Sequence, residues 1–355
     1  MAKKILITGG AGFVGSSLAL LLKKNYPLYE IFCMDNLKRK GSELNIPRLA
    51  SAGINFVHGD IRNKEDFEAI TACDTVIEAS AEPSVLAGLN SSPDYLLNTN
   101  LVGTLNCLSF AAKHKSDFIF LSTSRVYPIE NIEKIEFTED ATRFTVSTNQ
   151  SMLGVSKNGL NEDFSLKGFR SLYGATKLAS ELIIQEYNQF MNIKTVINRC
   201  GVLTGPWQMG KADQGVVVLW MAKHFWKKQL TYNGYGGTGK QIRDILHVTD
   251  LYRLIDIQMH DMEKVNGKIF NVGGGETVST SLLELTTICS SITGNSIPIK
   301  PILENRQADI RVYITDNTAI TEATGWKPQI GVQQIMQEIY DWIKENEEKL
   351  EPIIS

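Results

Sequence analysis

The chain has 355 residues, of which 43% are hydrophobic and 21% charged, as is typical of a soluble globular protein of one large or two modest domains. Its formal net charge of -3 gives no reason to expect binding to nucleic acid or to a membrane surface. The five cysteines stand singly, and we find no signal peptide or membrane span. We therefore expect a cytoplasmic protein with no metal site.

Short apolar runs alternate with helical patterns over roughly the first 200 residues. The runs that predict buried strands are residues 4–8, 31–34, 55–57, 75–77, 118–121 and 194–198. The helical patterns cover residues 13–24, 64–71 and 94–113. This alternation predicts an α/β fold of the Rossmann type, with a doubly wound parallel sheet between layers of helices. A polar, turn-rich stretch over residues 128–170 interrupts the pattern, and a stretch of that length is usually functional.

The pattern changes after about residue 200. Residues 242–248 indicate a strand that enters a helix, residues 270–275 and 325–328 are turn-rich, and the last 25 residues form one amphipathic helix. We therefore expect a first domain over residues 1–199, with segments of residues 230–275 returning to it. Residues 200–355 would form mainly a smaller α/β lobe.

A glycine-rich loop follows the first strand and opens the first helix. Gly9, Gly12 and Gly15 have the spacing GxxGxxG. Such glycines allow a tight turn, close approach of a pyrophosphate and packing of helix on strand, while the helix N-terminus attracts the phosphates. This context predicts a dinucleotide site, which we expect to include Phe13 and Val14.

Asp35 ends the second strand, 20 residues after Gly15. A carboxylate there binds ribose hydroxyls and repels a 2′-phosphate, which favours NAD over NADP. Lys38, Arg39 and Lys40 could instead hold a phosphate, but we interpret them as a solvated basic loop. Further along the chain, Asn36, Asp60 and Ile61 are candidates for contacts with the adenosine half.

Tyr173 and Lys177 lie four residues apart on one predicted helix and so point the same way. A neighbouring ammonium lowers the pKa of a phenol, which could then take a proton from an alcohol. Thr123, at the end of the fifth strand, could complete a Thr–Tyr–Lys set. The alternative is an ordinary amphipathic helix with a chance YxxxK.

In combination these motifs resemble the extended short-chain dehydrogenase/reductase family, in particular its NAD-dependent sugar-nucleotide epimerases and dehydratases. The resemblance covers nearly the whole chain. It rests on residues 8–15, Asp35-Asn36, residues 59–62 and 100–104, Ser122-Thr-Ser124, residues 173–177, 243–250 and 271–274.

The resemblance implies roles for individual residues. Thr123 would orient a hydroxyl, Tyr173 would act as acid/base, and Lys177 would bind the nicotinamide ribose and activate the tyrosine. It adds Ser80, Asn98 and Ser122 to the NAD site, besides Tyr173 and Lys177 themselves. The substrate residues that it implies are Glu82, Ser124, Cys200, Gln214, Arg243, Arg306 and Arg311. Arg306 and Arg311, around Asp309, could equally form an interlobe salt-bridge cluster.

The residues after Thr123 separate the reactions of this family. In its 4,6-dehydratases Asp-Glu follows the threonine, whereas Ser124 and Arg125 stand here, so the resemblance disfavours dehydration. Epimerisation requires only transient oxidation to a keto sugar and hydride return. The enzyme would then be an isomerase with a nucleotide-sugar substrate, in a surface-polysaccharide pathway.

Three segments, residues 137–145, 154–165 and 213–215, resemble the CDP-paratose 2-epimerases (CDP-tyvelose epimerases). The alternatives are a UDP- or GDP-sugar 4-epimerase and a catalytically silent, NAD-sensing binding protein. The intact Thr123, Tyr173 and Lys177 count against the silent protein. Relatives usually carry His-x-Ala-Gly or His-x-Ala-Ala where this chain has Glu78-Ala-Ser-Ala81, and Glu82 then follows as a second acid/base group or an ion-paired carboxylate.

Relatives commonly form homodimers through two long helices, which here correspond to residues 94–113 and 173–191. Apolar residues on both helices are compatible with a dimer, although a helix buried inside the protein would look the same.

Overall fold

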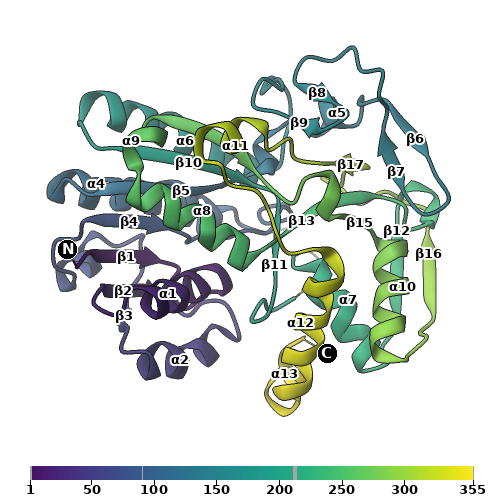
Figure 1. Cartoon of the computed structure of the whole chain (residues 1–355), viewed down its shortest axis with the longest axis horizontal. Helices are drawn as coiled ribbons and strands as arrows, with labels where there is room; N and C mark the ends of the chain where they lie inside the picture. Colours follow the sequence, from purple (N-terminus) through teal and green to yellow (C-terminus); the bar gives the residue numbers. More distant parts are fainter. Residues whose placement is uncertain (1, 90, 211–213, 355) are drawn as a thin grey trace.

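The computed structural model describes residues 2–89, 91–210 and 214–354 (Figure 1). A large parallel sheet between helices forms one part of the molecule, and smaller sheets with the C-terminal helices form the other. Asp213, which belongs to one of the segments used for the resemblance, lies outside the described residues.

Seven parallel strands form the large sheet, in the order β14-β10-β5-β4-β1-β2-β3. They are β1 (Lys4–Thr8), β2 (Glu30–Asp35), β3 (Asn55–His58), β4 (Thr75–Glu78), β5 (Asp117–Thr123), β10 (Thr195–Cys200) and β14 (Lys268–Val272). The predicted Rossmann-type fold is confirmed. The strand order reverses between β1 and β4, and ligands of open parallel sheets bind beyond the carboxyl ends of the strands at such a point.

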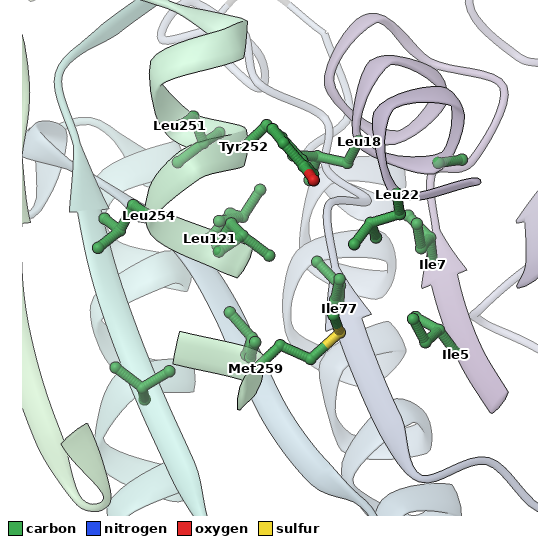
Figure 2. Close-up of a cluster of buried hydrophobic side chains, with 14 of the residues drawn as sticks. Ile5, Ile7, Leu18, Leu22, Ile77, Leu121, Leu251, Tyr252, Leu254 and Met259 are labelled. Carbon is green, nitrogen blue, oxygen red and sulfur yellow. The ribbon is translucent and has the colours of Figure 1, made fainter. Parts of the chain in front are cut away.

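Both faces of this sheet are buried under helices. Ile5, Ile7 and Ile77 point to the face covered by α1 (Phe13–Asn25) and α8 (Val248–His260), as Figure 2 shows. Their neighbours Leu6, Phe32, Val76, Phe118 and Phe120 belong to the core of the opposite face, which is covered by α4 (Gly103–His114) and α6 (Leu172–Phe190). Most of these strands are largely apolar because they are buried on both faces, which is why six of the seven appeared as strands in the sequence. The seventh, β14, was not predicted, because residues 270–275 were interpreted as turn-rich.

Two predicted helices of this domain differ from expectation. Residues 64–71 form a 3₁₀ helix, Lys64–Ala69. The single helix expected over residues 94–113 is interrupted, because a π-helical turn at Asn98–Val102 separates α3 (Asp94–Leu97) from α4. A π turn contains one extra residue and rotates the side chains that follow it, and such turns are frequent at functional sites.

The turn-rich stretch over residues 128–170 contains regular elements. They are α5 (Ile129–Ile132), the hairpin of β6 (Phe137–Glu139) and β7 (Phe144–Val146), and the hairpin of β8 (Val155–Ser156) and β9 (Gly159–Leu160). Tyr127, Phe164 and Tyr313 are fully or almost fully buried in the core beneath it. This stretch is therefore a packed extension of the fold that approaches the second lobe.

The second lobe has small sheets and a separate core around Trp220, Met221, Ile339 and Trp342. Its strands are β11 (Val202–Thr204), β13 (Ile242–His247), β15 (Ser279–Ser281) and β17 (Val312–Tyr313), and the pair β12 (Leu230–Asn233) and β16 (Ile299–Ile302). Its helices are α7 (Val216–Phe225), α10 (Leu282–Thr293), α12 (Val332–Glu345) and α13 (Glu347–Ile354). The single C-terminal helix predicted from the sequence is wrong, because the chain breaks at Asn346, between α12 and α13.

The shorter helices connect these parts. They are α2 (Ile46–Ser51), α9 (Met262–Val265), α11 (Thr318–Thr324) and the 3₁₀ turns Ser42–Asn45, Ser124–Val126, Tyr235–Gly237 and Glu276–Val278. The turn at Ser124–Val126 follows β5 directly and belongs to the candidate site.

Candidate active site

The loop after β1 leaves no space for side chains at its glycines. A Cβ on Gly9, whose φ is +67°, would lie 2.8 Å from the carbonyl oxygen of Ala79, and a Cβ on Gly15 would lie 2.2 Å from that of Gly9. Gly12 is the N-cap of α1, and no side chain caps this helix. The N-terminus of α1 therefore offers unpaired N–H groups and the positive end of its dipole to an anion.

Asp35 lies beside this loop at the end of β2. Its carboxylate accepts the N–H of Ala11 at 3.1 Å and that of Leu37 at 2.8 Å. Burial raises the pKa of Asp35, and these backbone hydrogen bonds oppose the shift. A carboxylate has acceptor positions beyond these two bonds, so Asp35 can also accept from a ribose hydroxyl.

A cavity of about 390 Å³ opens above the carboxyl ends of β1, β2 and β4. Most of the predicted cofactor residues line it: Gly9, Gly12, Phe13, Val14, Gly15, Asp35, Asn36, Ile61 and Ser80. In the described part of the chain Asp60 lines neither this cavity nor the second one. Asn36 donates to Asp60 at 2.9 Å; burial would raise the pKa of Asp60, but hydrogen bonds from Arg62 and Asn36 hold it at about 2.

The choice of Asn98 for this cavity is not supported. Asn98 is exposed, and the neighbouring Thr99 lines the cavity instead. Asn100 is fully buried and connects two segments of the site, because it bonds both the N–H and the carbonyl of Glu82 and donates to the Thr176 hydroxyl at 3.2 Å. Asn98 and Thr99 both lie in the π turn, and the resemblance that implied Asn98 did not reveal which of the two faces the cavity.

Lys38 and Lys40 are exposed, as expected of a solvated basic loop, whereas Arg39 is partly buried and bound to the protein, which corrects the interpretation for this residue. Arg39 donates to Gln214 at 2.6 Å and to the Met209 carbonyl, and Lys40 donates to the Pro352 carbonyl. Lys38 lies 5.4 Å from the centre of the Tyr95 ring. The segment thus ties the cofactor cavity to the second lobe.

Thr123 and Tyr173 come together at the carboxyl edge of β5. A Cβ on Gly174 would lie 2.0 Å from the carbonyl oxygen of Arg125, so helix α6 touches the turn after Thr123 directly. Ser171 caps this helix by accepting from the Gly174 N–H. Tyr173 is hydrogen-bonded to Thr123.

The expectation of a lowered tyrosine pKa is wrong for this structure. Burial raises the pKa of Tyr173 to about 12, although the hydrogen bond to Thr123 and the charge of Arg125 act in the opposite direction. The nearby Cys200 and Glu82 raise it further. The spacing of the sequence could not reveal how deeply the phenol is buried.

Lys177 is only 1% exposed. Its Nζ lies 3.8 Å from the centre of the Phe120 ring, and burial lowers its pKa while Glu78 and Glu181 raise it. Glu78 itself is fully buried, and its Oε1 lies 2.7 Å from the Thr104 hydroxyl. Burial raises the pKa of Glu78 to about 7, opposed by Lys177.

Ser122, predicted to bind NAD, does not line either cavity among the described residues. Its hydroxyl donates to Glu181, which forms a buried ion pair with Arg199 at 2.8 Å. Arg199 also donates to the Tyr127 hydroxyl. Sequence reasoning missed this network: Ser122 belongs to a motif that we identified, but its partners Glu181 and Arg199 are far from it in the chain and belong to none.

A second cavity, also of about 390 Å³, lies between the sheet and the second lobe. The predicted substrate residues Gln214, Arg243 and Arg306 line it, together with Arg125. Gln214 also lines the first cavity, so the two cavities meet at this residue. Glu82, predicted to bind substrate, lines the first cavity and not the second.

Other predicted substrate residues have different surroundings. Within the described ranges, Ser124, Cys200 and Arg311 do not line either cavity. Arg311 lies over the Phe137 ring and 4.0 Å from Glu133. The expected salt bridge of Asp309 forms with Arg243, at 2.9 Å, rather than with Arg306 or Arg311.

The sequence pattern of the NAD dependent epimerase/dehydratase family matches residues 5–273. The chain belongs to this family. Among relatives, it is 32% identical over 352 residues to CDP-paratose 2-epimerase of Salmonella typhi, which covers 96% of this chain and 98% of that one. It is 25% identical over 359 residues to dTDP-glucose 4,6-dehydratase of Streptomyces niveus, with 99% and 96% covered.

Solved structures of this family have the same fold. UDP-glucuronic acid 4-epimerase from Bacillus cereus, in complex with UDP-glucuronic acid and NAD, superimposes with a TM-score of 0.77 at 25% identity over 96% of this chain and 99% of that one. UDP-glucose 4-epimerase from Thermotoga maritima superimposes with a TM-score of 0.76 at 24% identity over 97% and 99%.

The family is NAD-dependent, and the first cavity fits a dinucleotide. The glycines of the loop leave room for a pyrophosphate against the uncapped N-terminus of α1, and Asp35 offers an acceptor to a ribose. In the part of the chain that the structure describes, we find no cluster of three or more metal-ligating side chains and no helix long and apolar enough to cross a membrane.

Proposed function

We propose that this enzyme is an NAD-dependent nucleotide-sugar epimerase of the CDP-paratose 2-epimerase type, which inverts C2 of a CDP-linked dideoxyhexose. The observation that carries the proposal is the hydrogen-bonded pair of Thr123 and Tyr173 at the carboxyl end of β5, followed by Ser124 and Arg125 rather than by two carboxylic acids. Dehydration needs such acids, whereas epimerisation needs only the hydroxyl pair and a dinucleotide. The Salmonella relative supports the choice of sugar.

Tyr173 would hold the proton that moves. Thr123 orients the sugar hydroxyl toward the phenol, and Tyr173 takes the hydroxyl proton as the carbon is oxidised and returns it after inversion. NAD⁺, when bound, accepts a hydride from the carbon and gives it back. Because the pKa of Tyr173 is raised to about 12, its ionisation in the free protein is unfavourable at neutral pH, and proton transfer depends on the cationic groups nearby.

Lys177 would supply one of these cations. Two buried carboxyl groups, Glu78 and Glu181, act on its ammonium and oppose its deprotonation in the dry interior. Arg125 supplies a second positive charge close to Tyr173. Glu82 lines the first cavity, where it could exchange a proton during inversion.

We further propose that residues 1–199, with α8 and β14, hold the cofactor, and that the rest of the chain binds the sugar nucleotide. Arg243 and Arg306 would meet the diphosphate in the second cavity, and Gln214 would contact substrate where the two cavities join. Asp60 would support the adenosine side through Asn36, and Ser122 would support Arg199 rather than touch NAD.

A UDP-sugar 4-epimerase is the second candidate. UDP-glucose 4-epimerase of Pisum sativum is 25% identical to this chain over 370 residues, which cover 97% of both chains. Its activity would require the same Thr–Tyr–Lys set, so only the substrate cavity separates the two functions. A silent NAD-binding protein has no need of that set.

We propose a homodimer. Exposed apolar side chains lie on both of the helices through which dimers of this type form: Leu97 (37% exposed), Val102 (39%), Leu182 (59%) and Phe190 (76%). Replacing Leu182 by Glu should convert a dimer to a monomer in analytical ultracentrifugation, and a wild-type monomer would contradict the proposal.

All five cysteines are buried and unpaired, which supports a reducing compartment such as the cytoplasm.

The deciding assay is turnover. The purified protein would be incubated with CDP-, UDP- and GDP-linked hexoses, and the products would be identified by nuclear magnetic resonance. We expect inversion of one carbon of a CDP-sugar without net oxidation. Turnover of UDP-sugars at C4 would favour the second candidate, and no turnover with any sugar nucleotide would favour the silent protein.

A further inference from the structure

Arg125 links the acid/base pair to the substrate cavity through three contacts. Its N–H donates to the Thr123 hydroxyl at 3.2 Å, and its carbonyl touches the helix at Gly174, next to Tyr173. Its guanidinium lines the second cavity and donates to the Ala308 carbonyl at 2.9 Å. One residue therefore contacts the catalytic hydroxyls with its backbone and the segment that carries Arg306 with its side chain.

Among the described residues that line the second cavity, cations outnumber carboxylates. Four cations line the second cavity: Arg125, Lys223, Arg243 and Arg306. Asp309 is the single carboxylate among the described residues of its wall, and it is paired with Arg243. No carboxylate oxygen of the described residues lies within 4.0 Å of the Arg125 guanidinium. A half-buried cation of this kind needs an anion, and the ligand can supply it.

The electrostatics agree with this picture. Burial lowers the pKa of Arg125 to about 10, the neighbouring Arg243 lowers it further, and Asp309 opposes the shift only in part. An arginine presents five N–H donors in a planar fork that matches a phosphate. The contact with Ala308 uses one of its two terminal nitrogens.

We propose that Arg125 binds the sugar-proximal phosphate of the substrate and thereby presents the C2 hydroxyl, rather than the C4 hydroxyl, to Tyr173. The inference rests on the proposed function. C2 is bonded to the anomeric carbon that carries the phosphate, whereas C4 lies across the ring. A phosphate bound by a residue that itself contacts Thr123 brings the near side of the ring to the catalytic pair.

The first test measures nucleotide binding and needs no turnover. Isothermal titration of the NAD-loaded protein with CDP and with CMP compares ligands that differ by the distal phosphate. Arg125→Gln should lower the affinity for CDP by about tenfold or more, because a charge-assisted hydrogen bond is lost. The affinity for CMP should fall much less. Arg125→Lys keeps the charge without the fork and should lose less. Equal CDP affinity in wild type and Arg125→Gln would overturn the phosphate contact.

Lys223→Gln is the matched control, since it removes another cation from the same cavity. An equal loss of CDP affinity in Lys223→Gln and Arg125→Gln would show a general charge effect and contradict a specific role of Arg125. The thermal midpoint and the bound NAD content of each variant show whether it is folded. If Arg125→Gln does not fold, Arg125→Lys carries the comparison.

The second test locates the reacting carbon. CDP-sugar deuterated at C2 or at C4 is turned over by the wild-type enzyme, and we expect a primary isotope effect from C2 only. An effect from C4 would overturn the assignment of the carbon. Failure to turn over any sugar nucleotide, with the selective loss of CDP affinity intact, would overturn the proposed function while still showing that Arg125 binds the diphosphate.

Discussion

The two cavities of this enzyme are of equal size but are built by different means. The cofactor cavity is shaped by main chain, since Gly9 and Gly15 allow contacts that no side chain would permit. The substrate cavity is shaped by side chains, many of them apolar, and carries four cations, among them Arg125 and Arg306. Main-chain constraints allow little variation, whereas side chains on loops can be exchanged without altering the fold.

This difference explains why family membership predicts the ligand of the cofactor cavity better than that of the substrate cavity. The cofactor cavity and the Thr123–Tyr173 pair meet general requirements of a dinucleotide and of proton transfer. In our proposal, the choice of sugar and of carbon depends on residues such as Arg125 and Gln214, which line the second cavity. Variants in the two regions should therefore fail in different ways.

The largest effect is expected from Tyr173→Phe, which removes the proton carrier at the junction of the two regions. Turnover should fall by about 10²- to 10⁴-fold. The NAD content and the CDP affinity should stay near wild type, because the ring is retained. Steady-state kinetics and isothermal titration measure these quantities, and an active variant would refute the assigned mechanism.

Gly15→Ala tests the main-chain construction of the cofactor cavity. The new Cβ would lie 2.2 Å from the Gly9 carbonyl, so the loop must shift, at a cost of about 1–3 kcal/mol, and bound NAD should be lost. Gly331→Ala is the control, because its Cβ would meet no atom within 4 Å; it should cost less than about 1 kcal/mol. Chemical denaturation measures the loss of stability in each variant. Similar losses in Gly15→Ala and Gly331→Ala would contradict the claim that main chain shapes the cofactor cavity.

Glu78→Gln probes the buried charge beneath Lys177. Burial raises the pKa of Glu78 from 4.5 to about 7, so between these pH values the folded protein keeps a proton that the unfolded chain releases. This contribution to wild-type stability is complete below pH 4.5 and is lost as the pH rises through 7.

Glutamine does not titrate. The free energy of unfolding of the variant, relative to that of the wild type, should therefore increase by up to about 3 kcal/mol between pH 4.5 and pH 8. Urea denaturation at the two pH values measures the change. The exposed Glu345→Gln is the control and should show the same difference from wild type at both. A constant difference for Glu78→Gln would contradict a raised pKa.

The smallest effect is expected from Lys38→Gln. Lys38 lines the cofactor cavity, but its ammonium rests over the Tyr95 ring, and Asp35 is expected to hold the ribose. The affinity for NAD should change by less than about fivefold. A large loss of NAD affinity in the variant, or NADP bound to the wild type, would show that the basic segment binds a 2′-phosphate.

Much of the cofactor region could be predicted because its signals are local. The strands are buried on both faces and therefore appear as apolar runs, and the loop from Gly9 to Gly15 lies between a strand and a helix in the sequence itself. The pairing of Tyr173 with Thr123 could be anticipated, since both stand at predicted element ends.

The remainder depends on contacts between distant segments. The ion pair of Glu181 with Arg199, the hairpins within residues 128–170 and the break at Asn346 have no local signature that we identified. Thr99, rather than the predicted Asn98, lines the cofactor cavity, and both lie in the π turn Asn98–Val102. The pKa of Tyr173 was predicted in the wrong direction because burial outweighs nearby charge.

One measurement tests the central claim most directly. The protein, purified without added cofactor, is given CDP-paratose, and the sugar is followed by nuclear magnetic resonance while absorbance at 340 nm records any net NADH. We predict conversion to the C2 epimer with no accumulation of NADH, and release of NAD on denaturation. Conversion that requires added NAD and yields NADH in proportion to product would identify a dehydrogenase and contradict the account.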